Sequence, residues 1–244
     1  MRHTTVTGAV LLPLTIALAA CSGAAPQSSA PVQGKAAHYT YIMDVSLSPA
    51  TITDPAITRA VERRIGADMK RDAKLGDVFS VFEAGSADAA RMVGHTPIVS
   101  GYNLRLAAAH AKLVGQLQEI AGRFHDHGGD NATHLTEALE AIQPDCASGR
   151  DELTLITDGV EESGTYSAAR ALALGKPVHL PDPSGRFLAG CHRITFLGFG
   201  LTDDGAGHER LLPSGQLAAL RQGWLDYLTQ AGVRAEDVHF VSAL

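Results

Sequence analysis

Five oxygen-bearing residues, spread over more than a hundred positions, could together bind a hard cation. Asp44, Ser46 and Ser48 follow one apolar run, Thr133 precedes an amphipathic stretch, and Asp158 follows a second apolar run. Because the carboxyl ends of neighbouring strands form the ligand crevice of an open α/β sheet, we expect these side chains to converge there. Two carboxylates and three hydroxyls make an all-oxygen site, which suits Mg²⁺, Mn²⁺ or Ca²⁺.

The order and spacing of these residues also resemble a known motif. The loop 44–48 reads Asp-Val-Ser-Leu-Ser, Thr133 lies far downstream, and Asp158 is followed by Gly159. This pattern resembles the metal-ion-dependent adhesion site of von Willebrand factor A domains. The resemblance covers residues 38–244 and implies a domain of that type, with a cation at the end of its first strand.

The resemblance implies a role for each ligand. Asp44, Ser46 and Ser48 would bind the cation from one loop, and Thr133 would supply a further hydroxyl. Asp158 would hold a coordinated water or bind directly. One coordination position would remain for an acidic side chain of a protein partner.

Two residues in or beside the first loop depart from the family pattern. Leu47 stands where the family commonly has Gly, and Pro49 follows the motif at once.

The hydroxyls and carboxylates could instead cap helices and satisfy loop amides, as Ser, Thr and Asp often do. The alternatives to a binding module are a metal-dependent hydrolase with His134 as its base, or a metal-free scaffold with the same fold.

Apolar runs alternate with amphipathic stretches along residues 38–244. Strands are expected at Tyr39–Met43, Asp77–Phe82, Met92–Val99, Glu152–Thr157, Arg193–Phe199 and Val238–Val241. Helices are expected from Asp54 to Gly76, from Leu106 to about Gly122, at Leu135–Ile142, at Ala168–Leu174 and from Leu217 to Leu228. This alternation predicts an α/β fold: a Rossmann-like, open and mostly parallel sheet with helices on both faces. Pro97 places its strand at an edge of the sheet.

The N-terminus reads as a targeting signal. Arg2 and His3 precede an apolar stretch, and Leu18-Ala19-Ala20-Cys21 follows it. This arrangement is typical of a secretory signal over residues 1–20. The Leu-Ala-Ala-Cys ending resembles a bacterial lipobox, which implies a lipid on Cys21 and a chain anchored at the periplasmic or surface face of the cell envelope. The alternative is an ordinary signal with a Cys near its cleavage site.

Composition limits the classes of partner. The chain has 244 residues, of which 45% are hydrophobic, and a formal charge of −6 that becomes −7 once Arg2 leaves with the signal. A nucleic-acid binder would normally show a basic face, so none is expected here. Residues 21–37 are mostly small and polar, and we expect a flexible tether there because such a stretch buries little apolar surface.

Two cysteines remain beside Cys21. An exported chain meets an oxidising compartment, so Cys146 and Cys191 are expected to form a disulfide rather than two buried free thiols. They precede the runs at Glu152–Thr157 and Arg193–Phe199. If those runs are adjacent parallel strands, both cysteines lie at the same edge of the sheet.

The remaining polar groups carry weaker signals. The histidine-rich loop 125–134 matches no metal motif that its spacing would justify. Glu161-Glu162 and Asp203-Asp204 are expected to be solvated, and Trp224 is expected in the core. The chain has no Gly-x-Ser-x-Gly elbow and no phosphate loop, so we expect a binding module and not an enzyme.

Overall fold

The computed structural model describes residues 34–46, 52, 54–85, 90–98, 102–127, 132–163, 166–203 and 209–242. Within these ranges, the side chains at 102–105, 125–127, 203 and 209 are not described. The predicted signal, Cys21 and most of the tether lie outside the described residues, and so does Ser48. Residues 34–244 form one compact unit. No helix among the described residues is long and apolar enough to cross a membrane.

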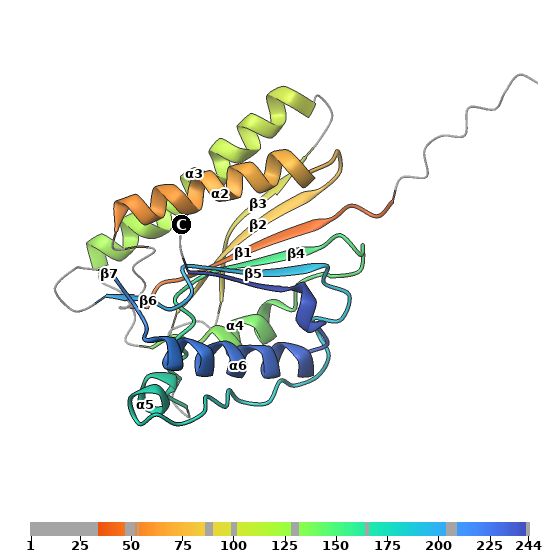
Figure 1. The fold of residues 1–244 in the computed structure, drawn as a ribbon. Helices are drawn as coiled ribbons and strands as arrows, with labels where there is room; N and C mark the ends of the chain where they lie inside the picture. The colour runs from red at the N-terminus through yellow and green to blue at the C-terminus, as the bar shows by residue number, and fades with distance from the viewer. Residues whose placement is uncertain are drawn as a thin grey trace, which may run out of the picture. The chain divides into compact units, whose positions relative to one another are not determined.

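A six-stranded sheet forms the centre of this unit (Figure 1). Its strands, in chain order, are β1 (His38–Asp44), β2 (Val78–Ala84), β3 (Arg91–Pro97), β4 (Glu152–Ile156), β5 (Arg193–Leu197) and β8 (Val238–Val241). They lie side by side in the order β3-β2-β1-β4-β5-β8, and every pair is parallel except β2–β3. The predicted α/β class is therefore confirmed, with the Pro97 strand at an edge. The order reverses direction between β1 and β4.

Helices cover both faces of the sheet. One face carries α2 (Pro55–Asp72) and α3 (Tyr102–His127), and the other carries α4 (Leu135–Ile142), α5 (Ala168–Ala173) and α6 (Ser214–Gln230) (Figure 1). Side chains alternate along β1 because successive residues of a strand point to opposite faces. Tyr39, Tyr41 and Met43 pack in the core beneath α2 and α3, whereas Ile42 packs in the core beneath α4 and α6.

Helix α2 shows how the sequence specifies an element. Asp54 caps it by accepting a hydrogen bond from the amide of Ala56 at 2.6 Å, and Pro55 occupies the first turn, where its missing N–H costs nothing. The predicted stripe is buried as expected: Ile57, Val61, Ile65 and Met69. The helix runs antiparallel to β1, so its C-terminal end lies near the start of that strand, where the Tyr39 hydroxyl donates to the Asp72 carbonyl.

Two elements differ from the prediction. Helix α3 continues to His127, so His125-Asp126-His127 lies in its last turn and not in a loop. A mid-helix glycine costs only about 1 kcal/mol relative to alanine, and Phe124 beyond Gly122 still packs against the core. A short antiparallel hairpin of β6 (Leu201–Asp203) and β7 (Glu209–Leu211) follows β5 and was not predicted, because three-residue strands leave too little alternation to recognise.

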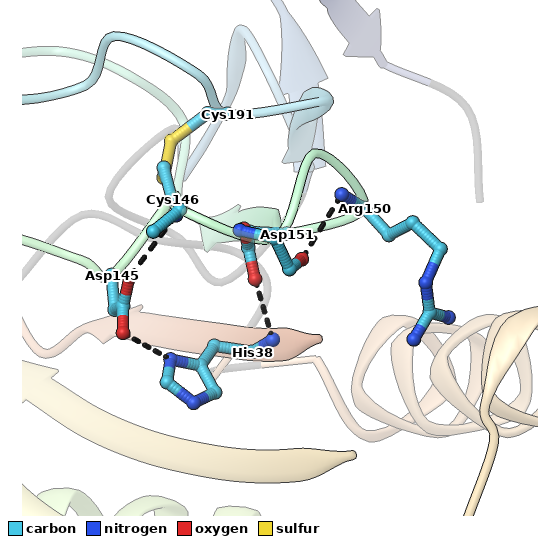
Figure 2. The surroundings of a disulfide bond; sticks show 8 residues. His38, Asp145, Cys146, Arg150, Asp151 and Cys191 are labelled. Carbon is cyan, nitrogen blue, oxygen red and sulfur yellow. Dashed lines mark hydrogen bonds and ion pairs between the residues drawn. A yellow bond between two sulfur atoms is a disulfide. The ribbon is translucent and has the colours of Figure 1, made fainter. Parts of the chain in front are cut away.

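A disulfide joins Cys146 and Cys191, with a Cα–Cα distance of 4.6 Å, as predicted (Figure 2). The bond ties the loops that precede β4 and β5, which are adjacent parallel strands. Asp151 lies in the first of these loops, where its carboxylate accepts hydrogen bonds from the amides of His38 and Ser148 at 2.8 and 2.6 Å. The amino ends of β1, β4 and β5 are thus held together at one edge of the sheet.

Candidate functional site at the carboxyl edge of the sheet

Asp44 is the last residue of β1, and it is fully buried. One of its carboxylate oxygens, Oδ1, accepts the amide of Ser46 at 2.9 Å, which turns the chain back over the strand end. The other, Oδ2, accepts the hydroxyl of Thr157 at 2.7 Å. Since Thr157 directly follows β4, this second hydrogen bond joins the ends of two neighbouring strands.

Asp158 lies two residues beyond the end of β4 and is also fully buried. Its Oδ1 accepts the amide of Val160 at 2.8 Å. The loop turns at Gly159, whose φ of +79° favours glycine, and a Cβ there would lie 2.6 Å from the Phe199 ring. The indole N–H of Trp224 donates to the Gly159 carbonyl at 2.7 Å. The glycine of the motif is therefore required by both backbone conformation and space.

Thr133 is buried and precedes α4. Its carbonyl accepts the amide of Glu162 at 3.0 Å, so the start of α4 is joined to the loop that contains Asp158. The structure thereby brings three of the predicted segments to the edge where the strand order reverses. This reversal is where open α/β sheets bind their ligands.

Glu161 corrects one prediction. It was expected to be solvated, but it is fully buried beneath the start of α4. Its two carboxylate oxygens accept the amide of Leu135 at 3.0 Å and the hydroxyl of Thr136 at 2.8 Å. The carboxylate satisfies donors of the first turn, which have no partner within the helix.

The pKa of Glu161 is raised to about 8, and burial is the main cause. Hydrogen bonds from Thr136 and Leu135 act to lower this pKa, and the negative charge of Asp44 makes a smaller contribution that raises it. The influence of Asp44 indicates that both carboxylates share one electrostatic environment. A third fully buried acidic side chain, Asp158, lies in the same loop as Glu161. A pKa of about 8 leaves Glu161 mostly protonated near neutral pH, so the two aspartates are the acidic groups of this site that could bind a cation.

The hydroxyl of Ser46 supports the same conclusion. Its Oγ atom is buried and makes no hydrogen bond to any described residue. Buried polar atoms usually have a hydrogen-bond partner in native structures. A cation beside Asp44 would give this oxygen a partner, so the residues present fit the proposed ligand set.

One proposed ligand, Ser48, lies outside the described residues, together with Leu47 and Pro49. Among the described residues, no group of three or more His, Cys, Asp or Glu side chains could hold a metal ion. The predicted set contains only two carboxylates, those of Asp44 and Asp158, and takes its other oxygens from hydroxyls.

Two residues of the site were missed in the sequence. Thr157 had a usable signal, because a hydroxyl residue directly before Asp158 also lies at the strand end. Glu161 had no such signal in the sequence, because its burial depends on the tertiary position of the first turn of α4. His134, considered as a base, is half-buried and its Nδ1 contacts the carboxylate of Glu137 in α4.

Comparisons with known proteins concern the fold. No protein-family model and no curated protein matches the chain. Among solved structures, it is similar to an aerotolerance-related membrane protein from Bacteroides fragilis, with 15% identity over 84% of this chain and 90% of that chain and a TM-score of 0.44.

Two further likenesses cover only part of the other protein. A von Willebrand factor type A protein from Catenulispora acidiphila shares 17% identity over 66% of this chain and 33% of that chain, with a TM-score of 0.38. Proximal thread matrix protein 1 from the mussel byssus shares 13% identity over 85% of this chain and 44% of that chain, with a TM-score of 0.42. The chain thus spans less than half the length of either. The neighbours include the family that the sequence motif resembles, and the doubly wound fold follows from this chain's own strand order.

Proposed function

We propose that this chain is a protein-binding module that holds a divalent cation where β1 and β4 end. The ligands are Asp44, Ser46, Ser48, Thr133 and Asp158. The observation that carries the proposal is the buried hydroxyl of Ser46, which makes no hydrogen bond within the described part of the chain and lies beside the fully buried carboxylate of Asp44. Both lie at the reversal of strand order, where this fold class binds its ligands.

The chemistry of the site supports Mg²⁺, Mn²⁺ or Ca²⁺. Carboxylates and hydroxyls are hard oxygen ligands, and these cations prefer them. When bound, the cation would offer one coordination position to an acidic side chain of a protein partner. The remaining residues position the ligands: Thr157 orients Asp44 through its hydroxyl, and Trp224 holds the Gly159 carbonyl.

The proposal extends to the cellular setting. Cys21 would carry the lipid that anchors the chain in a bacterial envelope, and residues 21–37 would let the module reach its partner. The acidic balance of the chain favours a protein partner over a nucleic acid. We propose no catalytic role, because the residues of the site serve as ligands or hold ligands in place.

Ion-dependent stability tests the proposal. A ligand that binds only the folded state stabilises it by about 2.7 kcal/mol at a hundredfold excess over its Kd. Mg²⁺ should therefore raise the melting temperature of the full-length chain, and a chelator should reverse the gain. Asp158→Asn should remove the effect, whereas Asp182→Asn, in an exposed loop, should retain it.

Capture experiments separate the candidate functions. A partner retained on the immobilised chain in Mg²⁺, released by chelator and lost with Asp158→Asn supports the module. Retention that ignores chelator supports the metal-free scaffold. Ion-dependent turnover of generic ester or phosphoester substrates would replace the module by the hydrolase.

A further inference from the structure

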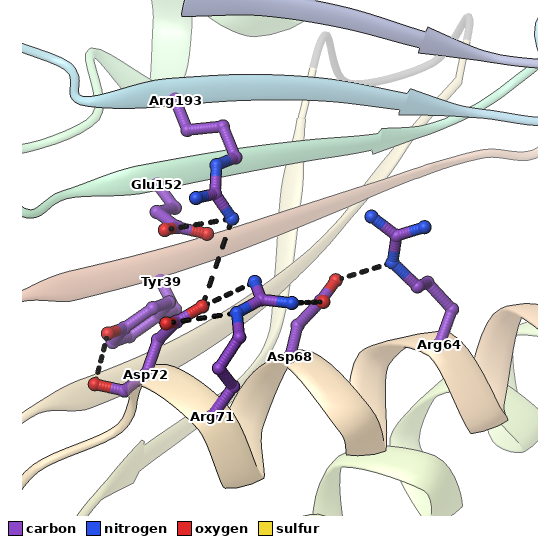
Figure 3. Close-up of polar contacts among 7 residues, drawn as sticks. All are labelled: Tyr39, Arg64, Asp68, Arg71, Asp72, Glu152 and Arg193. Atoms are coloured by element: carbon purple, nitrogen blue, oxygen red, sulfur yellow. Dashed lines mark hydrogen bonds and ion pairs between the residues drawn. The ribbon is translucent and has the colours of Figure 1, made fainter.

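A polar hollow lies at the amino ends of the strands, opposite the candidate cation site. Its volume is about 300 Å³, within the lower range of small-ligand pockets. It lies between the end of α2 and the starts of β1, β4 and β5 (Figure 3). It is lined by Tyr39, Arg71, Asp72, Lys74, Arg150, Glu152, His192 and Arg193.

Basic side chains are the most numerous in this lining. Arginine and lysine supply four permanent cations and His192 adds an imidazole, whereas Asp72 and Glu152 supply the two carboxylates of the lining. Asp68 and Asp77, outside the lining, pair with Arg71 and Arg150, so the local balance is four minus four, or zero, with His192 neutral. Arg193 and Lys74 are therefore the cations on which binding of an anion would mainly depend.

Two of the cations are fixed in position by carboxylates. Arg71 donates to Asp72 through Nε and Nη2, at 3.1 and 2.5 Å, and to Asp68 through Nη1 at 2.9 Å. Arg150 donates to the buried carboxylate of Asp77 at 2.8 Å. Guanidinium groups held in this way are pre-organised, so less entropy is lost when a ligand adds further contacts.

The other cations have donors to offer. The guanidinium of Arg193 forms only long ion pairs, at 3.5 Å to Glu152 and 3.8 Å to Asp72, and makes no hydrogen bond within the described part of the chain (Figure 3). The ammonium of Lys74 and the ring of His192 likewise make no hydrogen bond to described residues. A guanidinium presents five N–H donors in a planar fork that matches phosphate oxygens.

The disulfide holds the loops that carry these groups. Cys191 directly precedes His192, and the amide of His192 donates to the Asp151 carbonyl at 2.8 Å. Arg150 lies in the other linked loop, next to Asp151 (Figure 2). The hollow is thus built on covalently tied segments, which favours a defined ligand geometry.

Glu152 is the acidic group that an anion would meet. Its side chain is only 12% exposed, and burial raises its pKa to about 7. Arg193 on β5 and Arg71 on α2 act to lower that pKa, whereas Asp72 and Asp68 on α2 raise it. Near neutral pH, Glu152 can therefore take up a proton when an anion binds, and then donate a hydrogen bond to it.

We propose that this hollow binds a tetrahedral oxyanion, such as the phosphoryl group of a small ester or of a lipid headgroup. Arg193, Lys74 and His192 would donate to its oxygens, with Arg71 and Arg150 completing the positive lining. The site goes beyond the cation site and does not rest on it, because the two lie at opposite edges of the sheet.

Calorimetry with sulfate and with glycerol phosphate, at constant ionic strength, tests the proposal on the full-length chain. We expect saturable binding that Arg193→Gln weakens about tenfold or more, since a hydrogen bond to a charged group contributes about 1.5–3 kcal/mol. Arg63→Gln is the matched control, because Arg63 is an exposed arginine of the same helix α2 and lies outside the lining. Sulfate should bind more tightly at about pH 6 than at about pH 8, because it keeps its charge while Glu152 titrates.

A second variant and a comparison of vesicles complete the test. If Arg193→Gln does not fold, Lys74→Gln, at an exposed position, should still weaken binding. Vesicles with and without phosphatidylglycerol, tested in the Cys21→Ser background, distinguish a lipid headgroup from a soluble ester. The proposal is overturned if neither sulfate nor glycerol phosphate binds saturably up to about 10 mM, a range typical of weak ligands. Equal weakening by Arg193→Gln and Arg63→Gln would also overturn it, because it would indicate only diffuse surface charge.

Discussion

The carboxylate of Asp44 is held by hydrogen bonds from two different segments. The Ser46 amide belongs to the loop after β1, and the Thr157 hydroxyl belongs to the end of β4. A buried carboxylate that lost one of these donors would keep its charge without the matching contact. The Thr157 hydroxyl therefore both stabilises the apo fold and orients a ligand of the proposed cation site.

Thr157→Val removes this hydroxyl at nearly constant volume. We expect a loss of about 1–3 kcal/mol in the free energy of unfolding at neutral pH, because a buried acceptor loses its donor. Thr96→Val is the control, since the Thr96 hydroxyl is buried and makes no hydrogen bond to any described residue. Denaturant unfolding should show no loss for Thr96→Val. Equal losses in both variants would mean that the bond to Asp44 contributes nothing specific.

Glu152 should make stability depend on pH. Its ordinary pKa of 4.5 rises to about 7 in the folded chain, so the folded state holds a proton that the unfolded state has released between these values. Stability from this group is therefore complete below about pH 4.5 and is lost as pH rises towards 7. The pKa of Glu161 is also raised, but Glu161 is present in both the native chain and the Glu152→Gln variant. The difference between their stability–pH profiles therefore reports on Glu152 alone.

In Glu152→Gln, the loss of unfolding free energy between about pH 5 and pH 8 should shrink by on the order of 1–3 kcal/mol. Glu236→Gln provides the control, because the Glu236 side chain is 70% exposed. Denaturant unfolding across this range measures both. An unchanged pH profile in Glu152→Gln would contradict the burial of a charge-sensitive carboxyl there.

The predictability of the site differs from residue to residue. Asp44 and Asp158 could be placed from sequence because a polar residue after an apolar run marks a strand end, and Thr133 because it precedes a helical stripe. Glu161 could not, because adjacent charged residues usually indicate a solvated loop. Only the tertiary position of the first turn of α4 gives its carboxylate buried donors.

At the scale of elements, periodicity predicted where buried contacts form but not where helices end. The stripe of α2 and its cap at Asp54 agree with the structure. Helix α3 passes Gly122, because tertiary packing of residues such as Phe124 outweighs a local propensity. The β6–β7 hairpin was not predicted because its strands are too short to show an alternating pattern, although they pair locally.

The disulfide is a covalent constraint on the loops that precede β4 and β5. Its cysteines are 45 residues apart in sequence, and closing a loop of that length contributes about 4 kcal/mol in the chain-entropy model. The double variant Cys146→Ser, Cys191→Ser should lose about this amount in denaturant unfolding. Reduction of the native chain should give the same loss. Two alkylatable thiols in the oxidised native protein would contradict the pairing.

At the scale of the molecule, the two ends of the parallel strands carry different sets of polar groups. Three fully buried carboxylates gather at the carboxyl edge: Asp44, Asp158 and Glu161. The amino edge gathers arginines and a lysine around a hollow and is tied by the disulfide. The parallel order of the strands produces this polarity, because all carboxyl ends of parallel strands meet on one side.

Anchoring concerns the whole chain. Cys21→Ser should move the protein from the membrane fraction to the soluble fraction, because each buried CH₂ of an attached lipid contributes about 0.8 kcal/mol to membrane binding. Ser22→Ala, the neighbouring substitution, should leave the distribution unchanged. Fractionation of lysed cells measures both. If the Cys21→Ser chain stays entirely with membranes, its anchor is not a lipid on this residue.

Cation binding by Asp44 can be measured directly with Mn²⁺, whose free aqueous form gives an electron paramagnetic resonance signal that weakens on binding. We expect titration of the full-length chain to show one bound Mn²⁺ per molecule, displaced by excess Mg²⁺. Asp44→Asn should abolish this binding, because it removes the charge of a fully buried ligand, while Asp182→Asn should not. Absence of binding at millimolar Mn²⁺, or binding that survives Asp44→Asn, would contradict a cation site at the end of β1.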